Sequence, residues 1–319
     1  MEKGLISVVV PVYNGESGIK RCLESLTAQT YKNTEIIVIN DGSTDNTGKI
    51  IEDFASRDKR IKPFHIENGG VSNARNTGIE NSQGEFIMFT DGDDTLEPET
   101  LKIMADKMGE NTDFVHCGMR KITENGEKLF WEKKLNAKKA EGQNLILAEF
   151  FRKNIMSTSC AKLYRRSTVA DIRFDRNFAV GEDELFSFYI CSNSKEAVII
   201  ENVFYNYIEN SDSVMNKNFS DKHFQALSVM DIQLDKVKDN KELYRLASLC
   251  DAERSNELMW KMFDTQKMYH KFDFLRERML SHKKYYLTAK EYSIKDKVLY
   301  ILLWLMPKTY YKLKLKQNS

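Results

Sequence analysis

The sequence lacks the features that mark disulfide-rich, zinc-binding, secreted and membrane-spanning proteins. Its five cysteines are odd in number and scattered, with no C-x-x-C pair, so neither a zinc site nor a disulfide framework is expected. The longest apolar run near the end, Val298 to Met306, falls short of the ~20 residues that span a bilayer. The start MEKGLISVVV lacks the long apolar region of a signal peptide. These absences predict a cytoplasmic protein in a reducing compartment.

The sequence also lacks an excess of charge of either sign. The formal net charge is +1, which gives no overall reason to expect nucleic acid as a partner. The charge is uneven, however. Residues 266–319 hold thirteen Lys and Arg against four acids, a net charge of +9 that leaves −8 for the preceding residues. This asymmetry indicates a basic C-terminal segment that meets an anionic partner.

Two common phosphate-binding motifs are missing. No G-x-G-x-x-G follows the first apolar segment, and no G-x-x-x-x-G-K-[ST] occurs in the chain. These motifs hold phosphates on backbone N–H groups of a glycine-rich loop. A phosphate-bearing ligand is therefore expected to be held by side chains and a metal ion instead.

The first part of the chain alternates between continuously apolar segments and segments with helical spacing. Strands are predicted at 5–12, 35–40, 61–66 and 85–90, and helices at 17–30, 45–56 and 72–79. This alternation predicts βαβ units and a parallel sheet, in which the carboxyl ends of the strands share one edge. Ligands of such sheets bind at that edge. Three residues that follow predicted strands should therefore converge there: Tyr13, Asp41 and Asp91.

The segment GEFIMFTDGDD at 84–94 is the centre of the candidate site. Its apolar run ends in acids, and the two-residue spacing of Asp91 and Asp93 places both side chains on one side of an extended backbone. Two hard carboxylates can hold Mg²⁺ or Mn²⁺ while a substrate phosphate supplies further ligands. The alternative is ordinary turn chemistry, in which Asp94 caps a helix predicted at 97–108.

The later part of the sequence contains further predicted strands and a helix, and then a long region of helical patterns. Strands are predicted at 113–119, 129–131 and 197–207, a hairpin turn at Asn125-Gly126 and a helix at 144–152. From about Ser220 onward, helical patterns continue almost to the end. The sequence therefore predicts a domain of residues 1–219 and a helical region of residues 220–319.

Four segments in order resemble one family of enzymes. They are VVVPVYNGE at 8–16, VINDGSTDNT at 38–47, GGVSNARNTGIENSQGEFIMFTDGDD at 69–94 and GEDELF at 181–186. Together they resemble the inverting glycosyltransferases of family 2. The resemblance implies the α/β GT-A fold for nucleotide-sugar transferases, with a Rossmann-like, mostly parallel sheet, followed here by a helical C-terminal extension.

The resemblance implies a binding site for a UDP-sugar. Pro11 and Tyr13 would pack against the uracil ring, since an aromatic face suits a flat base. Asp41 would accept a hydrogen bond from uracil N3–H, although an Asx turn in Asp-Gly-Ser-Thr is an alternative or additional role. Arg75 would reach the uracil or the diphosphate. Lys162, in CAKLYRR, would lie near the donor, or else be a surface lysine.

The resemblance also implies roles for the acids. Asp91 would contact the ribose and nucleotide, and Asp93 would bind the Mn²⁺ or Mg²⁺ that bridges the diphosphate. Asp183 would be the base that takes the proton of the acceptor hydroxyl, with Glu182 orienting the site or the acceptor. The alternative for both is that they are first-turn acids favoured by a helix dipole.

The implied reaction is sugar transfer from a UDP-sugar to a hydroxyl of a lipid-linked saccharide in the synthesis of a capsule or exopolysaccharide. Two alternatives remain: transfer to polyprenyl phosphate, and a nucleotide-sugar-binding module without activity. Only the charge of the C-terminal segment favours nucleic acid. The sugar, the linkage and the oligomeric state stay open.

The end of the chain combines apolar and basic residues. Ile294, Val298, Ile301 and Leu305 recur at helical spacing, with lysines around them at 295, 297, 308, 312, 314 and 316 and interleaved aromatic residues. This pattern is typical of a helix that lies on an anionic membrane surface. The alternative is a helix packed on the catalytic domain or on a partner subunit.

Overall fold

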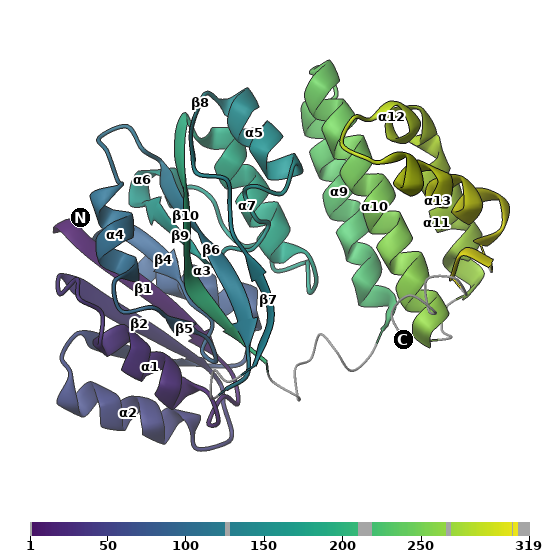
Figure 1. The fold of residues 1–319 in the computed structure, drawn as a ribbon. Helices are drawn as coiled ribbons and strands as arrows, with labels where there is room; N and C mark the ends of the chain where they lie inside the picture. The colour runs from purple at the N-terminus through teal and green to yellow at the C-terminus, as the bar shows by residue number, and fades with distance from the viewer. Residues whose placement is uncertain (1, 125–127, 210–218, 266–268, 308, 312–319) are drawn as a thin grey trace. The chain divides into compact units, whose positions relative to one another are not determined.

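The computed structural model describes residues 2–124, 128–209, 219–265, 269–307 and 309–311. They belong to two compact units, Met1–Phe178 with Glu182–Ser213, and Ala179–Gly181 with Val214–Ser319 (Figure 1). The turn predicted at Asn125-Gly126 and the lysines at 308, 312, 314 and 316 lie outside the described residues.

The first unit is built on a mixed sheet. The described residues form ten strands in the order β3-β2-β1-β4-β9-β6-β10-β5, with β7 paired to β6 and β8 to β10. Neighbouring strands are parallel from β3 to β4, and β6 and β10 are parallel to each other. The strands are β1 (Glu2–Val12), β2 (Thr34–Asp41), β3 (Ile61–Ile66), β4 (Gly84–Phe89), β5 (Thr95–Leu96), β6 (Phe114–Ile122), β7 (Leu129–Lys133), β8 (Lys138–Glu141), β9 (Lys162–Arg165) and β10 (Glu196–Ile208).

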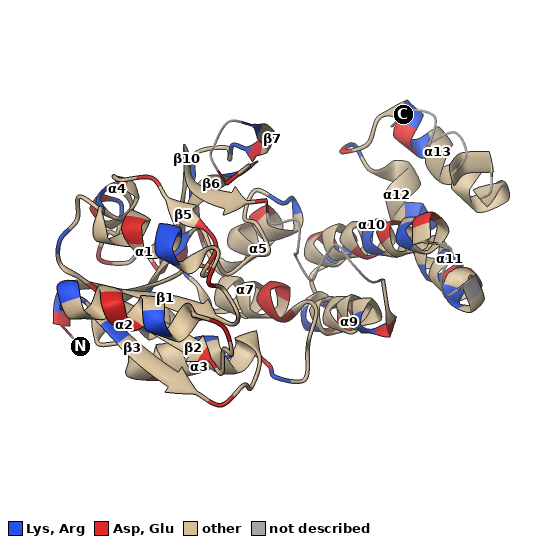
Figure 2. Cartoon of the chain, turned by 90° about the horizontal axis from the view of Figure 1, so that it is seen from below, with Lys and Arg blue, Asp and Glu red and all other residues tan. Residues whose placement is uncertain are grey.

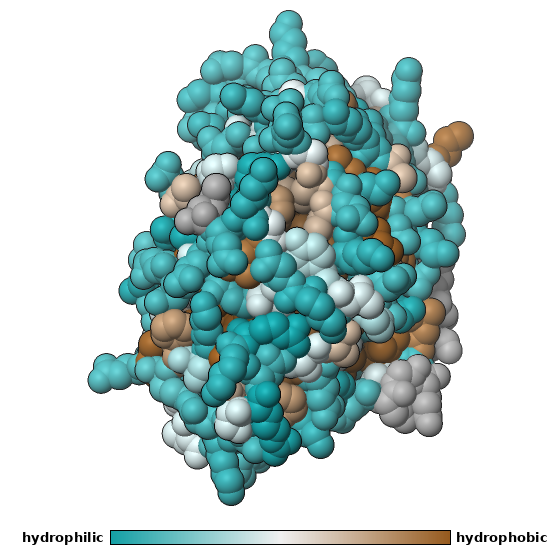
Figure 3. Space-filling model, turned by 90° about the vertical axis from the view of Figure 1, so that its left-hand side faces the viewer, coloured by the Kyte–Doolittle hydropathy of each residue, from teal (hydrophilic) through white to brown (hydrophobic). Residues whose placement is uncertain are grey.

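Helices cover this sheet and bury apolar residues against it. Helix α1, for example, buries Ile19, Cys22, Leu23 and Leu26, which lie on one face at helical spacing. On the face of the molecule in Figure 3, hydrophilic side chains predominate. The helices of this unit are α1 (Ile19–Thr27), α2 (Thr47–Arg57), α3 (Val71–Asn81), α4 (Thr100–Asp106), α5 (Gln143–Phe151), α6 (Arg166–Val169) and α7 (Glu182–Asn193).

The α/β fold class is confirmed, with two local corrections. Asp94 does not cap the next helix, because the chain first forms β5 and α4 begins only at Thr100, with Glu99 at its N-cap. Strand β9 was not predicted. It lies between β4 and β6 and is antiparallel to both. Two of its four residues, Lys162 and Arg165, are charged, so its sequence does not read as a central strand.

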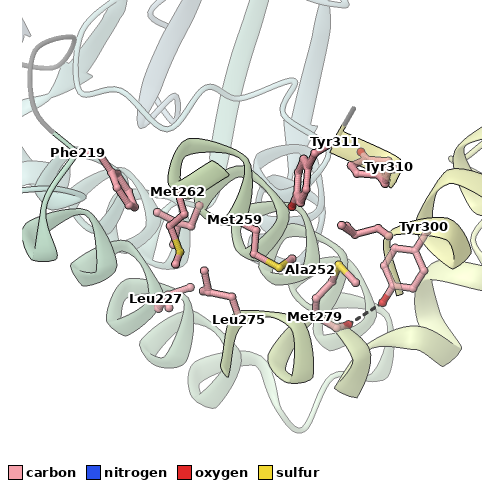
Figure 4. Close-up of a cluster of buried hydrophobic side chains, with 12 residues drawn as sticks. Phe219, Leu227, Ala252, Met259, Met262, Leu275, Met279, Tyr300, Tyr310 and Tyr311 are labelled. Atoms are coloured by element: carbon pink, nitrogen blue, oxygen red, sulfur yellow. Dashed lines mark hydrogen bonds between the residues drawn. The ribbon is translucent and has the colours of Figure 1, made fainter. Parts of the chain in front are cut away.

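The second unit is helical. Its core gathers aromatic and methionine side chains from several helices, and the Tyr300 hydroxyl donates a hydrogen bond to the Met279 carbonyl at 2.6 Å (Figure 4). No helix in the described part of the chain is both long enough and apolar enough to cross a membrane. The helices are η1 (Asp221–Phe224), α9 (Gln225–Val237), α10 (Lys241–Thr265), η2 (Tyr269–Lys271), α11 (Phe272–Ser281), α12 (Lys283–Thr288) and α13 (Ile294–Leu305).

Candidate active site

The candidate site lies at the carboxyl edge of the parallel strands. Asp41 ends β2, and Asp91 follows β4 by two residues. Two glycines allow the acidic turn to pack closely: a Cβ on Gly18 would lie 2.9 Å from the Asp93 Cα, and one on Gly92 would lie 2.9 Å from the Val12 Cβ. The turn is therefore held against the end of β1 and the start of α1.

Arg75 on α3 joins acids from two distant parts of the chain. Its Nη2 lies 2.9 Å from Asp91 Oδ1, while its Nη1 lies 2.9 Å from Asp183 Oδ1 and 3.3 Å from Glu182 Oε1. Burial opposes the charge of this side chain, but the carboxylates outweigh it, and the pKa of Arg75 is raised well above its ordinary value. Arg75 is therefore a permanent cation that links the acidic turn to the start of α7.

An aromatic cluster fixes the start of α7. Phe186, one turn after Glu182, stacks on Phe174 with ring centroids 4.0 Å apart, and Phe89 packs edge-on against both. Phe174 also lies under the Arg75 guanidinium, 5.1 Å from ring centroid to Cζ. Apolar packing thus places the acidic first turn of α7, visible at one end of that helix in Figure 2, beside Arg75.

The acids of the site do not share one environment. Burial, together with the nearby charge of Asp183, raises the pKa of Glu182 to about 7, although Arg75 lowers it in part. Asp183 retains 27% of its side-chain exposure and Glu182 14%. Asp183 can therefore meet an incoming hydroxyl, while Glu182 holds a proton over part of the neutral pH range.

Asp93 has the chemistry of a metal ligand. Among the residues that the structure describes, no other side chain donates a hydrogen bond to its carboxylate. Burial and the charge of Asp91 raise its pKa, so a bound cation would relieve an unfavourable position. The described residues contain no cluster of three His, Cys, Asp or Glu that could hold a metal ion. Asp93 fits a metal that takes its remaining ligands from a diphosphate and water.

Asp94 is a structural anchor that the sequence did not reveal as such. Its Oδ2 accepts a hydrogen bond from the Tyr205 hydroxyl at 2.6 Å, and its Oδ1 accepts one from the Ile208 N–H at 2.9 Å. The Tyr205 hydroxyl also accepts from the Asp91 N–H at 3.2 Å. These bonds tie the acidic turn to β10, and the Asp94 side chain is 1% exposed.

The predicted base-binding residues lie at the same edge in different settings. Tyr13 is 54% exposed, whereas Pro11 is buried within β1. The two carboxylate oxygens of Asp41 accept hydrogen bonds from the Gly69 and Gly70 N–H groups, at 2.8 and 2.9 Å. The carboxylate is therefore not in an Asx turn; it holds the start of α3 and keeps unused lone pairs.

Lys162 is not a surface lysine. It is 1% exposed, and its ammonium donates hydrogen bonds to the Met156 carbonyl at 2.8 Å and to the Thr158 carbonyl. Burial lowers the pKa of Lys162 to about 8. The side chain thus supports the loop before β9, and its contact with a donor stays a prediction.

Comparisons with known proteins assign the family. Residues 7–173 match the model of "Glycosyl transferase family 2". Bacillus subtilis "Putative glycosyltransferase EpsH" is 32% identical over 76% of this chain and 72% of its own length, and "Uncharacterized glycosyltransferase EpsJ" of the same organism is 33% identical over 69% and 67%. The solved structure of S. aureus TarS 1-349 in complex with UDP-GlcNAc aligns with a TM-score of 0.70 and 22% identity, over 88% of this chain and 81% of that one.

The family model and the glycosyltransferase relatives thus identify a glycosyltransferase, and the solved structure shows that its fold is GT-A-like. The chain belongs to glycosyltransferase family 2.

Proposed function

We propose that this enzyme moves a sugar from a UDP-sugar, with inversion, to a hydroxyl of a lipid-linked saccharide in surface-polysaccharide synthesis. The observation that carries the proposal is the bridge formed by Arg75, which joins Asp91 at the end of β4 to Asp183 at the start of α7. A donor at the strand edge and a base on α7 would then act on one reacting carbon. The UDP-GlcNAc in the TarS complex supports a UDP-sugar as donor.

The donor side is assigned as follows. The exposed ring of Tyr13 stacks on uracil, and a free lone pair of Asp41 accepts the N3–H. Asp91 contacts the ribose, and Arg75 supplies N–H donors to the diphosphate. Pro11 and Lys162 support this site from within β1 and β9.

The residues on the acceptor side carry out the transfer. The Asp183 carboxylate takes the proton of the acceptor hydroxyl as its oxygen bonds to the anomeric carbon, on the face opposite the departing UDP. Glu182 orients the acceptor. Asp93 would hold Mn²⁺ or Mg²⁺, which when bound neutralises charge on the leaving diphosphate. A single displacement converts an α-linked donor into a β-linked product.

Calorimetric titration with nucleotides tests the donor assignment. With Mn²⁺ present, UDP should bind at least about tenfold more tightly than GDP, because Asp41 accepts from N3–H and a purine does not fit the same position. Equal affinity for UDP and GDP would contradict this assignment.

Glu182 should produce a step in the pH profile. As pH rises through about 7, Glu182 loses its proton, and the carboxylate accepts a stronger hydrogen bond from the acceptor that it orients than the neutral acid does. The kcat/KM of the wild type is therefore expected to rise across this range, while Glu182→Gln stays on the low-pH level without a step. If Glu182→Gln shows a step of the same size near pH 7, the step arises from the titration of another group.

We further propose that residues 220–319 dock the catalytic domain, residues 1–219, on an anionic membrane. Helix α13 packs into the helical unit through Tyr300 and Leu303, which leaves a second apolar face outward. On that face, Ile294 is 82%, Val298 49% and Leu305 62% exposed. Lysines 295 and 297 flank the face, as in helices that lie on anionic lipid.

Flotation with vesicles tests this docking. The double variant Ile294→Asn/Leu305→Asn should bind phosphatidylglycerol-containing vesicles at least about tenfold more weakly, because each buried aliphatic side chain contributes about 1.5–3 kcal/mol. Leu287→Asn, which alters an exposed apolar residue on α12, is the matched control and should bind like the wild type. Equal flotation of the double variant and the wild type would remove the membrane proposal.

A further inference from the structure

A row of side chains crosses the sheet beside the acidic turn. On neighbouring strands, Tyr207 pairs with Lys121, and Lys121 pairs with Trp131. Residues directly opposite one another share a face of the sheet, and so do residues two apart on one strand. The row therefore lies on the same face as Tyr205, whose hydroxyl bonds Asp94 and the Asp91 N–H.

A register shift adds a second ring to this row. Ile122 pairs with Leu129 and Lys121 with Trp131, so β7 has one extra residue, Phe130, between them. Such bulges redirect side chains, often next to active sites. The Lys121 ammonium lies 5.5 Å from the Phe130 ring centroid and 5.6 Å from that of Tyr207, which brings both rings to the same lysine.

The β6–β7 hairpin is also tied directly to the acidic turn. Glu124, just after β6, forms an ion pair with Nη1 of Arg21 on α1. Nη2 of the same guanidinium donates a hydrogen bond to the Asp93 carbonyl at 3.1 Å. One arginine thus sets the position of the hairpin relative to the residue assigned to the metal.

The rings on β7 are open to solvent. Trp131 is 43% and Phe130 41% exposed, and β7 is exposed along its whole length. Two neighbouring exposed aromatic rings are a candidate binding surface. Lysines interrupt the rings, since the ammonium of Lys128 also lies 4.8 Å from the Phe130 centroid. Flat apolar faces among cationic hydrogen-bond donors match a pyranose ring, which has C–H faces and a rim of hydroxyls.

We propose that Trp131 and Phe130, with Lys121 between the strands, form the platform that binds the acceptor saccharide. The sugar next to the reacting one stacks on the Trp131 ring, and one of its hydroxyls accepts a hydrogen bond from Lys121, whose ammonium also pairs with Glu209.

The platform lies on the face of the sheet that carries Tyr205, and the Tyr205 hydroxyl bonds the Asp91 N–H. Arg75 joins Asp91 to Asp183, so the end of the acceptor chain is placed toward Asp183 in this proposal. This inference rests on the proposed glycosyl transfer.

Kinetics of acceptor use test the platform. The donor is the UDP-sugar that the wild type hydrolyses, and the acceptors are oligosaccharides of glucose, galactose, N-acetylglucosamine and N-acetylgalactosamine. Trp131→Ala should raise the KM for the acceptor about tenfold, the order expected for a lost aromatic contact. Its rate of UDP release in the absence of acceptor should stay within about twofold of the wild-type rate. Trp131→Phe should restore most of the affinity.

Leu129→Ala is the matched control. Leu129 is 55% exposed on the same strand. The bulge at Phe130 separates it from Trp131, so Leu129 pairs with Ile122 and lies on the opposite face of the sheet. It should behave like the wild type. An unchanged acceptor KM in Trp131→Ala, or an equal loss of UDP release without acceptor, would overturn the platform.

Two further outcomes separate this inference from the proposed function. A wild type that consumes no UDP-sugar contradicts the proposed function itself. A second outcome is that the wild type hydrolyses UDP-sugar without transferring the sugar to any of the oligosaccharides. In that case the fluorescence of Trp131, taken as the difference between the wild type and Trp131→Phe, must still change when one of the oligosaccharides is added. No change with any oligosaccharide, or a dimer that Trp131→Ala converts to monomer, would show that β7 is not a saccharide site.

Discussion

Asp183→Asn is expected to lower the rate of sugar transfer by about 10²–10⁴-fold, the usual contribution of a general base, with little change in UDP affinity. The amide keeps the shape of the side chain but cannot take a proton from the acceptor hydroxyl. Arg75 loses one carboxylate partner and keeps Asp91 and Glu182, so the donor site should persist. Transfer kinetics and calorimetric titration of UDP with Mn²⁺ measure the two quantities separately.

Glu184→Gln is the matched control, because Glu184 lies in the same first turn of α7 but is not among the acids that pair with Arg75. Its transfer rate should stay within a few-fold of the wild type. If Asp183→Asn transfers sugar at the wild-type rate, Asp183 is not the base. If it loses UDP affinity in proportion to rate, Asp183 organises the donor site instead.

Asp93→Asn is expected to reduce turnover of the UDP-sugar by at least about 100-fold at saturating Mn²⁺, because a bound cation contributes several kcal/mol of charge stabilisation. The variant should also bind Mn²⁺ weakly in the presence of UDP. Its thermal stability should be equal to or higher than that of the wild type, since burial and Asp91 disfavour the charge that is removed. Metal-dependent UDP release and thermal unfolding provide the two measurements.

This pair of results separates a metal ligand from a structural residue. An Asp93→Asn protein that is destabilised and inactive would indicate a structural role for the carboxylate. If the UDP release of Asp93→Asn depends on Mn²⁺ as that of the wild type does, another residue binds the metal. Asp106→Asn, which alters an exposed acid on α4, should match the wild type in both measurements.

The sequence predicted those features that depend on local patterns. Continuous apolar runs identified β1, β2 and β4, and the rule that parallel strands share their carboxyl edge placed Asp41 and Asp91 together. Contacts between distant residues carry no such pattern. Arg75 meets Asp183 across 108 positions, and Tyr205 meets Asp94 across 111. Asp94 was therefore misread as a helix cap: the strand of its true partner was predicted, but nothing in the sequence pairs that strand with the acidic turn.

The C-terminal helix shows a different limit of sequence analysis. Its apolar residues suggested either a membrane surface or a packed face. Helix α13 has a buried apolar face and an exposed one, because Tyr300 and Leu303 lie in the core of the helical unit while Ile294 and Leu305 are exposed. A helix with apolar residues on two faces does not reveal from its spacing which face is buried. Docking on a membrane stays a proposal, and flotation tests it.

The anomeric configuration of the product tests the proposed reaction most directly. The enzyme is mixed with Mn²⁺, a panel of α-linked UDP-sugars and the oligosaccharide acceptors, and the anomeric proton couplings of the product are recorded by NMR. Single displacement assisted by Asp183 predicts a β-linked product that forms only when a UDP-sugar is present. An α-linked product, or transfer from a GDP-sugar but from no UDP-sugar, would contradict it.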